Sequence, residues 1–127
     1  MIQTCVESVG TPDIVVNIAG VKGEDDWEAV YDINVKGVHH GVSTSMKKMS
    51  RDQGGAGGVV VNVSSTSGVT CVGDMFATPA YTASKHAVTA LTRTYGVGLK
   101  KISKSHFDFN NLYFSTSSGM RGQGCLW

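Results

Sequence analysis

The most informative stretch of the sequence reads Val59-Val60-Val61-Asn62-Val63-Ser64-Ser65-Thr66-Ser67-Gly68. Its first half is almost continuously apolar, and its second half is small and polar. Apolar runs without polar alternation are typical of parallel strands that helices cover on both faces. The stretch therefore predicts a buried strand that ends in a polar turn at one edge of a parallel sheet.

A second strand of this kind lies earlier in the chain, where Asp13-Ile14-Val15-Val16-Asn17 is followed by Ile18-Ala19-Gly20. Between the two strands, apolar residues recur every three or four positions, which predicts one long amphipathic helix. They are Trp27, Tyr31, Val35, Val38, Val42, Met46 and Met49. The run Gly54-Gly55-Ala56-Gly57-Gly58 ends this helix. Strand, helix and strand form a βαβ unit, so we predict an α/β fold with a parallel sheet.

A second helix is predicted after the second strand. Pro79 suits the first turn of a helix because its φ is already helical. Gly96 and Gly98 predict that this helix ends near Tyr95.

The composition excludes several classes of protein. Hydrophobic residues make up 41% and charged residues 17% of the chain, as in globular rather than disordered proteins. The net charge is +1 and neither sign forms a long block, so no nucleic-acid partner is predicted. No apolar run approaches the roughly 20 residues of a membrane span. Because the first residues also lack the pattern of a secretory signal, we expect a cytoplasmic protein.

The cysteines and histidines show no pattern of a disulfide framework or a metal site. Three cysteines, at positions 5, 71 and 125, are odd in number and far apart, which favours reduced thiols. His39, His40 and His86 lack the spacing of metal ligands, so packing or surface roles are favoured and no metal is predicted.

Tyr81 and Lys85 lie one turn apart on the second predicted helix, so their side chains share a face. A phenol with a pKa near 10 is a poor acid or base at neutral pH unless a nearby cation favours the phenolate. Lys85 is within reach to be that cation. The pair alone is weak evidence, because such residues on a helix surface usually have no joint role.

Other polar residues are expected near this pair. Ser64 and Ser65 end one predicted strand and Asn17 ends the other, so they lie at the carboxyl edge, where open α/β sheets bind ligands. Asn34 falls on the apolar stripe of the long helix. A buried amide without hydrogen-bond partners costs about 1–3 kcal/mol, so we expect Asn34 to be held either structurally or within a site.

Four segments, in this order, resemble motifs of the short-chain dehydrogenase/reductase family. They are Asn17-Ile18-Ala19-Gly20, Asp32-Ile33-Asn34-Val35-Lys36-Gly37, Val63-Ser64-Ser65-Thr66-Ser67-Gly68 and Tyr81-Thr82-Ala83-Ser84-Lys85. They look like the family's Asn-Asn-Ala-Gly segment, active-site asparagine, catalytic serine and Tyr-x-x-x-Lys motif. An ordered set is more specific than any single motif. The resemblance implies that residues 1–98 are part of an NAD(P)-binding domain, the central portion of a Rossmann-type doubly wound parallel sheet.

The resemblance also implies an oxidoreductase that uses NAD, with NADP not excluded, to oxidise a secondary alcohol to a ketone. Tyr81 would remove the hydroxyl proton, Lys85 would assist it and hold the nicotinamide ribose, and Ser65 would hold the reacting oxygen. Asn34 would anchor a water of the proton relay. The residues expected to contact the cofactor are Asn17, Ala19, Gly20, Tyr81 and Lys85.

Two stretches indicate a branch of the family. Residues 49–62 and 81–86 resemble enzymes that act on lipid-like secondary alcohols, and the Gly-Gly-x-Gly-Gly run is also similar to insect-type alcohol dehydrogenases. The resemblance implies a small-molecule alcohol or ketone as substrate and a homo-oligomer formed through the two long helices. Specificity would lie largely in the loop from Val69 to Thr78.

The chain departs from the family pattern at both ends. No Gly-x-x-x-Gly-x-Gly or Gly-x-Gly-x-x-Gly precedes Asn17, so the turn that binds the cofactor pyrophosphate is missing, and residues 1–10 resemble only the end of a helix. Residues 99–127 are expected to form a divergent, poorly ordered tail, in which Phe107 to Phe114 is the candidate for a short strand.

These departures predict a fragment, a wrongly delimited gene product or an alternative product of a longer enzyme. Both predicted strands would then expose a hydrophobic edge, and NAD would bind weakly. Two alternatives stay open: a non-catalytic fragment that pairs with a full-length relative through its helices, and an unrelated small binding module.

Overall fold

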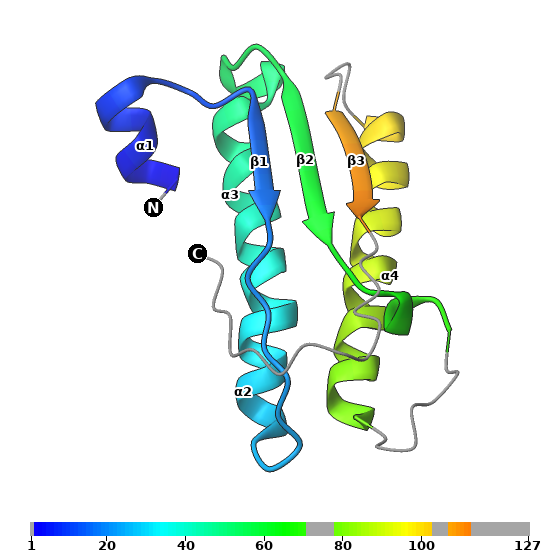
Figure 1. Ribbon diagram of the computed structural model, residues 1–127. Coiled ribbons are helices and arrows are strands. Elements are labelled where there is room, and N and C mark those ends of the chain that lie inside the picture. Colours follow the sequence, from blue (N-terminus) through cyan, green and yellow to red (C-terminus); the bar gives the residue numbers. More distant parts are fainter. Residues whose placement is uncertain (1, 71–77, 103–106, 113–127) are drawn as a thin grey trace.

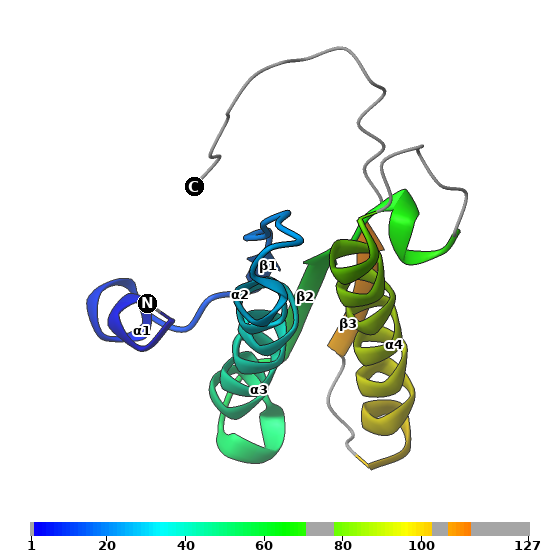
Figure 2. The ribbon, with the colours of Figure 1, turned by 90° about the horizontal axis from the view of Figure 1, so that it is seen from below.

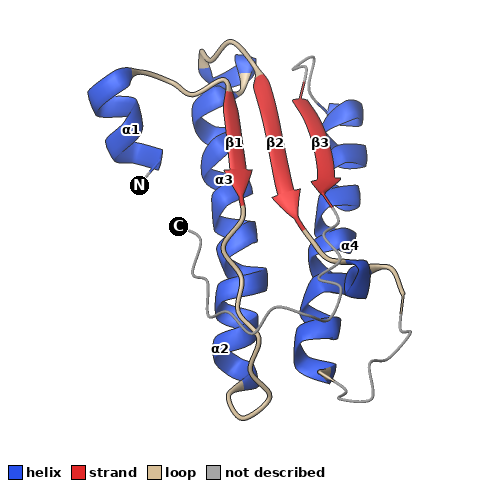
Figure 3. Cartoon of the chain, viewed as in Figure 1, coloured by secondary structure: helices blue, strands red, loops and turns tan. Residues whose placement is uncertain are grey.

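Two long helical segments pack on one face of a parallel sheet, and the first short helix lies to the side, as the computed structural model shows for residues 2–70, 78–102 and 107–112 (Figures 1 and 2). The elements are α1 (Ile2–Val9), β1 (Ile14–Asn17), α2 (Trp27–Tyr31), η1 (Asp32–Lys36), α3 (Gly37–Met49), η2 (Arg51–Gln53), β2 (Gly58–Val63), η3 (Thr66–Gly68), α4 (Pro79–Ile102) and β3 (Phe107–Leu112). Figure 3 colours this order of helices and strands. The predicted α/β class is confirmed.

The described strands stand in the order β1-β2-β3 and all run parallel. Val15 lies beside Val60 and Asn17 beside Asn62, and both β2 residues are fully buried under the helices. On β1 the alternate residues point the other way, and Ile14 and Val16 are 62% and 45% exposed. In Figure 1 the strands stand in front of the helices, with α3 behind β1 and α4 behind β3.

The third strand corrects the expectation for the end of the chain. Phe107–Leu112 pairs with β2 along its whole length, from Gly58 beside Phe107 to Val63 beside Leu112. The predicted short strand is therefore confirmed for these residues, and the prediction that β2 lacks an outer neighbour is wrong. Ladder hydrogen bonds come from the backbone, so a strand can form without a recognisable side-chain pattern. The rest of the expected tail, residues 103–106 and 113–127, lies outside the described residues.

The long helix predicted between the strands is present, but it is not uniform. Residues 27–49 run without a break through α2, the π-helical η1 and α3. A π turn holds an extra residue, which rotates the helix face before it relative to the face after it. Trp27, predicted on the buried stripe, is therefore 58% exposed and stacks edge-on against Tyr31, while Val30 is buried instead.

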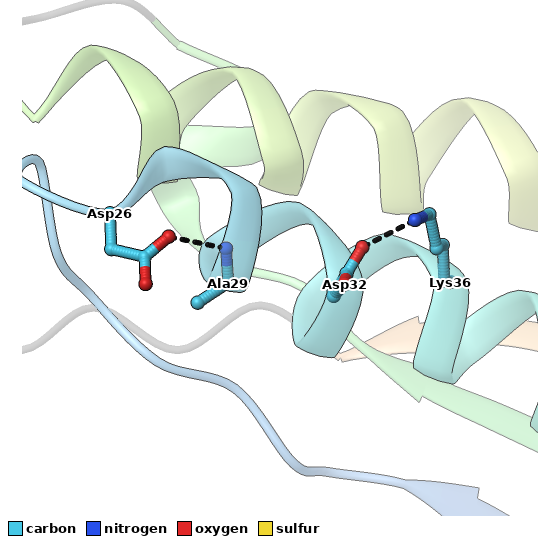
Figure 4. A network of polar contacts seen from close by, with 4 residues as sticks. All are labelled: Asp26, Ala29, Asp32 and Lys36. Atoms are coloured by element: carbon cyan, nitrogen blue, oxygen red, sulfur yellow. Dashed lines mark hydrogen bonds and ion pairs between the residues drawn. The ribbon is translucent and has the colours of Figure 1, made fainter.

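Two polar contacts stabilise the start of this helix (Figure 4). The Asp26 carboxylate accepts a hydrogen bond of 2.9 Å from the amide of Ala29, which caps α2. One turn further on, Lys36 pairs with Asp32 at 2.5 Å, and the hydrogen bond to this carboxylate raises the pKa of Lys36. Both contacts are at the surface, so they set the local path of the helix rather than its packing.

The fourth helix begins at Pro79 as predicted, but its predicted end is wrong. Gly96 and Gly98 lie inside α4, which continues to Ile102. Glycine costs a helix interior about 1 kcal/mol relative to alanine, and here α4 packs on both β2 and β3, which offsets that cost. A small core joins the helices to the sheet and consists of Val38, Val42, Val60 and Val88, with Met46 and Tyr95 against it.

Candidate active site

The ammonium group of Lys85 marks the place where β2, α4 and the loop after β1 meet. The side chain is only 4% exposed, and Nζ donates a hydrogen bond of 3.1 Å to the carbonyl oxygen of Val63, the last residue of β2. Burial lowers the pKa of Lys85 from its ordinary value of 10.5, because water no longer solvates the charge. The hydrogen bond to Val63 holds the Lys85 amine at the carboxyl edge of the sheet, the ligand-binding edge of open α/β folds.

Tyr81 stands one turn before Lys85 on α4, and the two are neighbours in space as predicted. Lys85 Nζ lies 5.7 Å from the centroid of the Tyr81 ring. A second ammonium, that of Lys22 in the loop after β1, lies 5.1 Å from the same centroid. Both distances are within the range of cation–π attraction, so the phenol ring is placed among positive charges.

Asn34 is held by hydrogen bonds on three sides, and its side chain is 1% exposed. Its Oδ1 accepts from the amide of Val21 at 2.8 Å, and its Nδ2 donates to the carbonyl oxygen of Val21 at 2.9 Å. Nδ2 also donates to Ser84 Oγ at 2.9 Å. Both amide hydrogens are therefore used, and the remaining capacity of the side chain is the second lone pair of Oδ1.

The two serines that end β2 have different partners. Ser64 Oγ donates to the carbonyl oxygen of Lys85 at 3.0 Å and lies 3.1 Å from Thr89 Oγ1, so its hydroxyl belongs to the contact between the sheet and α4. Ser65, which is 7% exposed, caps η3 and its Oγ accepts from the amide of Ser67 at 3.2 Å. Gly68 lets η3 approach α4, because a Cβ there would lie 2.7 Å from the Lys85 carbonyl oxygen.

The expected cofactor residues at the end of β1 and just after it separate into two groups. Gly20 lies at the centre, since a Cβ there would stand 3.1 Å from Lys85 Nζ and 3.3 Å from Asn34 Oδ1. Ala19 precedes it in the same exposed loop. Asn17 instead points into the helix layer, where its Nδ2 donates to Asn62 Oδ1 at 2.8 Å and its Oδ1 packs on Gly41. The Asn17 amide is thus placed apart from Lys85.

Besides Lys22, two more residues of this region were missed in the sequence. Glu24 accepts hydrogen bonds from the amides of Ala80, at 3.0 Å, and Tyr81, at 3.4 Å. Ser84, fully buried, donates to the carbonyl oxygen of Tyr81 at 2.7 Å. Ser84 lies inside the Tyr-x-x-x-Lys segment, so its place could have drawn attention. No local sequence pattern marks Glu24, because the helix amide that it binds lies 56 residues away in the chain.

His39 and His86 each have a polar partner on the helices. His39 Nδ1 lies 2.6 Å from the hydroxyl of Tyr95, and His86 Nδ1 lies 3.0 Å from the carbonyl oxygen of Thr82. In the described part of the chain, no group of three His, Cys, Asp or Glu side chains is placed to hold a metal ion.

Cys5 is a free thiol, and the other two cysteines lie outside the described residues. Within the same ranges, no helix is both long and apolar enough to cross a membrane.

Solved structures of other proteins share this fold. A structure described as a short-chain dehydrogenase from Novosphingobium aromaticivorans matches with a TM-score of 0.73 and 26% identity, over 88% of this chain and 42% of that one. A gluconate 5-dehydrogenase from Burkholderia cenocepacia, solved with NADP and tartrate, matches with a TM-score of 0.72 and 24% identity, over 88% and 44%. The second likeness concerns the fold alone.

Curated sequences give the same result. The 15-hydroxyprostaglandin dehydrogenases [NAD(+)] of Rattus norvegicus and Homo sapiens are each 39% identical over 89 residues, or 70% of this chain and 32% of theirs. The 3beta-hydroxysteroid dehydrogenase 2 of Eggerthella lenta is 34% identical over 73% of this chain and 37% of its own. The chain thus spans about a third of the length of these relatives. The short chain dehydrogenase family model matches residues 1–103. Together with the order and geometry of the four motifs, this shows that the chain belongs to the short-chain dehydrogenase family.

Proposed function

We propose that this chain carries the catalytic segment of an NAD-dependent oxidoreductase that oxidises a secondary alcohol to a ketone. The observation that supports the proposal most is the placement of the Lys85 ammonium between the end of β2 and the Tyr81 ring. This placement sets the Tyr81 ring and the Lys85 amine close enough to act together in general acid–base catalysis.

The residues around Lys85 fit a nicotinamide ribose at this edge. The glycine at position 20 leaves open the space beside Lys85 Nζ and Asn34 Oδ1 that a Cβ would fill. Lys85, Ala19 and Gly20 would hold the cofactor there, and Asn17 would support them by fixing the end of β1. Bound NAD would supply the acceptor for the hydride that leaves the carbinol carbon.

Each side chain would then have one task in the proton transfer. Tyr81 would take the proton from the substrate hydroxyl, and Ser65 would hold the reacting oxygen with a hydrogen bond. What supports Ser65 over Ser64 is that the Ser64 hydroxyl already binds the Lys85 backbone. The water assigned to Asn34 would bind at the free lone pair of Oδ1, and it would extend the relay from Lys85.

The finer features of the proposal come from the similar proteins. NAD is chosen because the name of the 15-hydroxyprostaglandin dehydrogenases includes it, whereas the gluconate dehydrogenase was solved with NADP. A lipid-like secondary alcohol as substrate rests on the same relatives. Association through α3 and α4, and a cytoplasmic location, remain predictions.

The test is the loss of the Tyr81 hydroxyl in a chain joined to the N-terminal nucleotide-binding half of a relative. With NAD and a secondary alcohol, Tyr81→Phe should lower the rate of NADH formation by about 10²-fold or more, since general acid–base catalysis contributes at least that much. Tyr31→Phe removes the same atom from α2 and should leave the rate unchanged. Full turnover by Tyr81→Phe would end the proposal.

A further inference from the structure

One short segment contacts the ring and the amide of Tyr81 and is linked indirectly to its carbonyl. Residues 21–24, called the 21–24 segment below, follow β1 in the chain and lie far from α4 in sequence. Lys22 reaches the Tyr81 ring, with Nζ 5.1 Å from its centroid. Glu24 accepts a hydrogen bond from the Tyr81 amide at 3.4 Å. The backbone of Val21 is tied to the Tyr81 carbonyl through two buried side chains.

The Glu24 carboxylate covers the start of α4. The first amides of a helix have no acceptor inside the helix, and the partial positive charge there attracts an anion. The Thr82 amide already binds the carbonyl oxygen of Thr78, at 2.8 Å. The two amides before it, of Ala80 and Tyr81, are the ones that Glu24 accepts, at 3.0 and 3.4 Å. Glu24 therefore satisfies donors that would otherwise have only water.

The link to the Tyr81 carbonyl is a buried chain of hydrogen bonds. Ser84 Oγ donates to this carbonyl at 2.7 Å and accepts from Asn34 Nδ2 at 2.9 Å. Asn34 in turn binds both the amide and the carbonyl of Val21. Because Asn34 and Ser84 are fully buried, this chain has few alternative partners. The amide and the carbonyl of Tyr81 are thus both connected by hydrogen bonds to the same loop, the first directly and the second through Ser84 and Asn34.

We propose that the 21–24 segment is a positioning device for Tyr81, with Glu24 as its polar anchor. The loop after β1 sets where the phenol stands relative to Lys85, and the segment acts through Tyr81 without taking part in the chemistry. The importance of this position for turnover rests on the proposed function. The positioning itself belongs to the described chain and is measurable without turnover.

The experiment is nuclear magnetic resonance on the chain with labelled tyrosine and labelled backbone amides. Glu24→Gln removes the charge and one acceptor oxygen. The amides of Ala80 and Tyr81 should exchange with solvent about tenfold faster, as expected when a charge-assisted hydrogen bond is lost. The ring signal of Tyr81, assigned from its absence in Tyr81→Phe, should shift as well. If Glu24 only capped the helix and did not position Tyr81, the exchange of the two amides would change but the Tyr81 ring signal would not shift.

The matched control is Asp25→Asn. Asp25 is exposed, carries the same charge one residue away, and makes no hydrogen bond or ion pair with another described residue. It should change neither the exchange nor the ring signal. The proposal is wrong if Glu24→Gln behaves like Asp25→Asn, or if it equally exposes the core amides of Val60 and Val88, because Glu24 would then act on the whole fold. Retained turnover in Tyr81→Phe would overturn the proposed function and leave this result intact.

Discussion

At the scale of the residue, the buried side chain of Asn34 connects separate parts of the fold. It lies in the π turn of a helix, yet its three hydrogen bonds join the loop after β1 to α4. Its burial follows from the apolar periodicity around it, and burial without these partners would be unfavourable. Asn34 therefore has a structural task that is independent of any role in proton transfer.

Replacing Asn34 by alanine should lower the free energy of unfolding by about 2–4 kcal/mol, because the Val21 backbone and Ser84 lose partners in a buried place. The measurement is urea unfolding. Asp32→Asn, in the same π turn but at the surface, should leave the free energy of unfolding nearly unchanged. Equal stability of the two variants would show that the Asn34 network is not stabilising.

Lys85 gives a prediction for pH dependence. Its pKa is lowered in the folded protein by burial, so between that lowered value and the ordinary value of 10.5 the unfolded chain binds more protons than the folded one. Stability contributed by this group should therefore rise with pH in this window and be lost as pH falls through the lowered pKa. Urea unfolding of the wild type and Lys85→Met across the alkaline range should show a more positive slope in the wild type. Parallel slopes would contradict it.

At the scale of elements, glycine sets how closely α3 approaches the sheet. A Cβ at Gly41 would stand 2.1 Å from Asn17 Oδ1, at the point where Asn17 binds Asn62. At Gly37, four residues earlier and near the start of α3, a Cβ would meet nothing closer than a backbone oxygen at 3.8 Å. The same substitution should therefore have opposite effects at the two positions.

Gly41→Ala should lower the free energy of unfolding by about 1–3 kcal/mol, as overpacking at a rigid contact does. Gly37→Ala should raise it by about 0.5–1 kcal/mol, because alanine favours the helix and restricts the unfolded chain. Thermal unfolding of both variants tests the pair. A stable Gly41→Ala would mean that α3 can move away from β1 at no cost.

At the scale of the whole molecule, the sheet is covered unevenly. The face of β1 away from α3 presents Ile14 and Val16, both largely exposed, and Ile18 follows them at 52% exposure. Within the described residues, β2 pairs on both sides while β1 pairs only with β2. Exposed strands with apolar side chains favour association.

The isolated chain should therefore form larger species as its concentration rises, which sedimentation velocity can measure. Val16→Lys places a charge on the open face and should reduce association without loss of stability, since Val16 is already 45% exposed. Thr11→Lys adds the same charge in a loop and serves as the control. A wild-type chain that stays monomeric at all concentrations would contradict this prediction.

Local patterns in the sequence were sufficient for the βαβ unit, the start of α4 at Pro79 and the neighbourhood of Tyr81 and Lys85. Hydrophobic period, helix-starting proline and one-turn spacing act between residues close in the chain, so they can be recognised without coordinates. The end of α4 was misjudged because helix packing outweighs the intrinsic cost of glycine. Strand β3 was only a candidate, since its pairing uses backbone groups.

Only the tertiary structure decided which groups surround Tyr81. Three contacts join residues that are distant in the chain: Asn34 with Ser84, Ser64 with Lys85, and Glu24 with the start of α4. Such hydrogen bonds form because packing brings their donors and acceptors together, and neither partner carries a local sign of the other. The sequence by itself therefore determined the types and order of the candidate site residues. Their mutual arrangement depends on how the loop after β1 folds against α4.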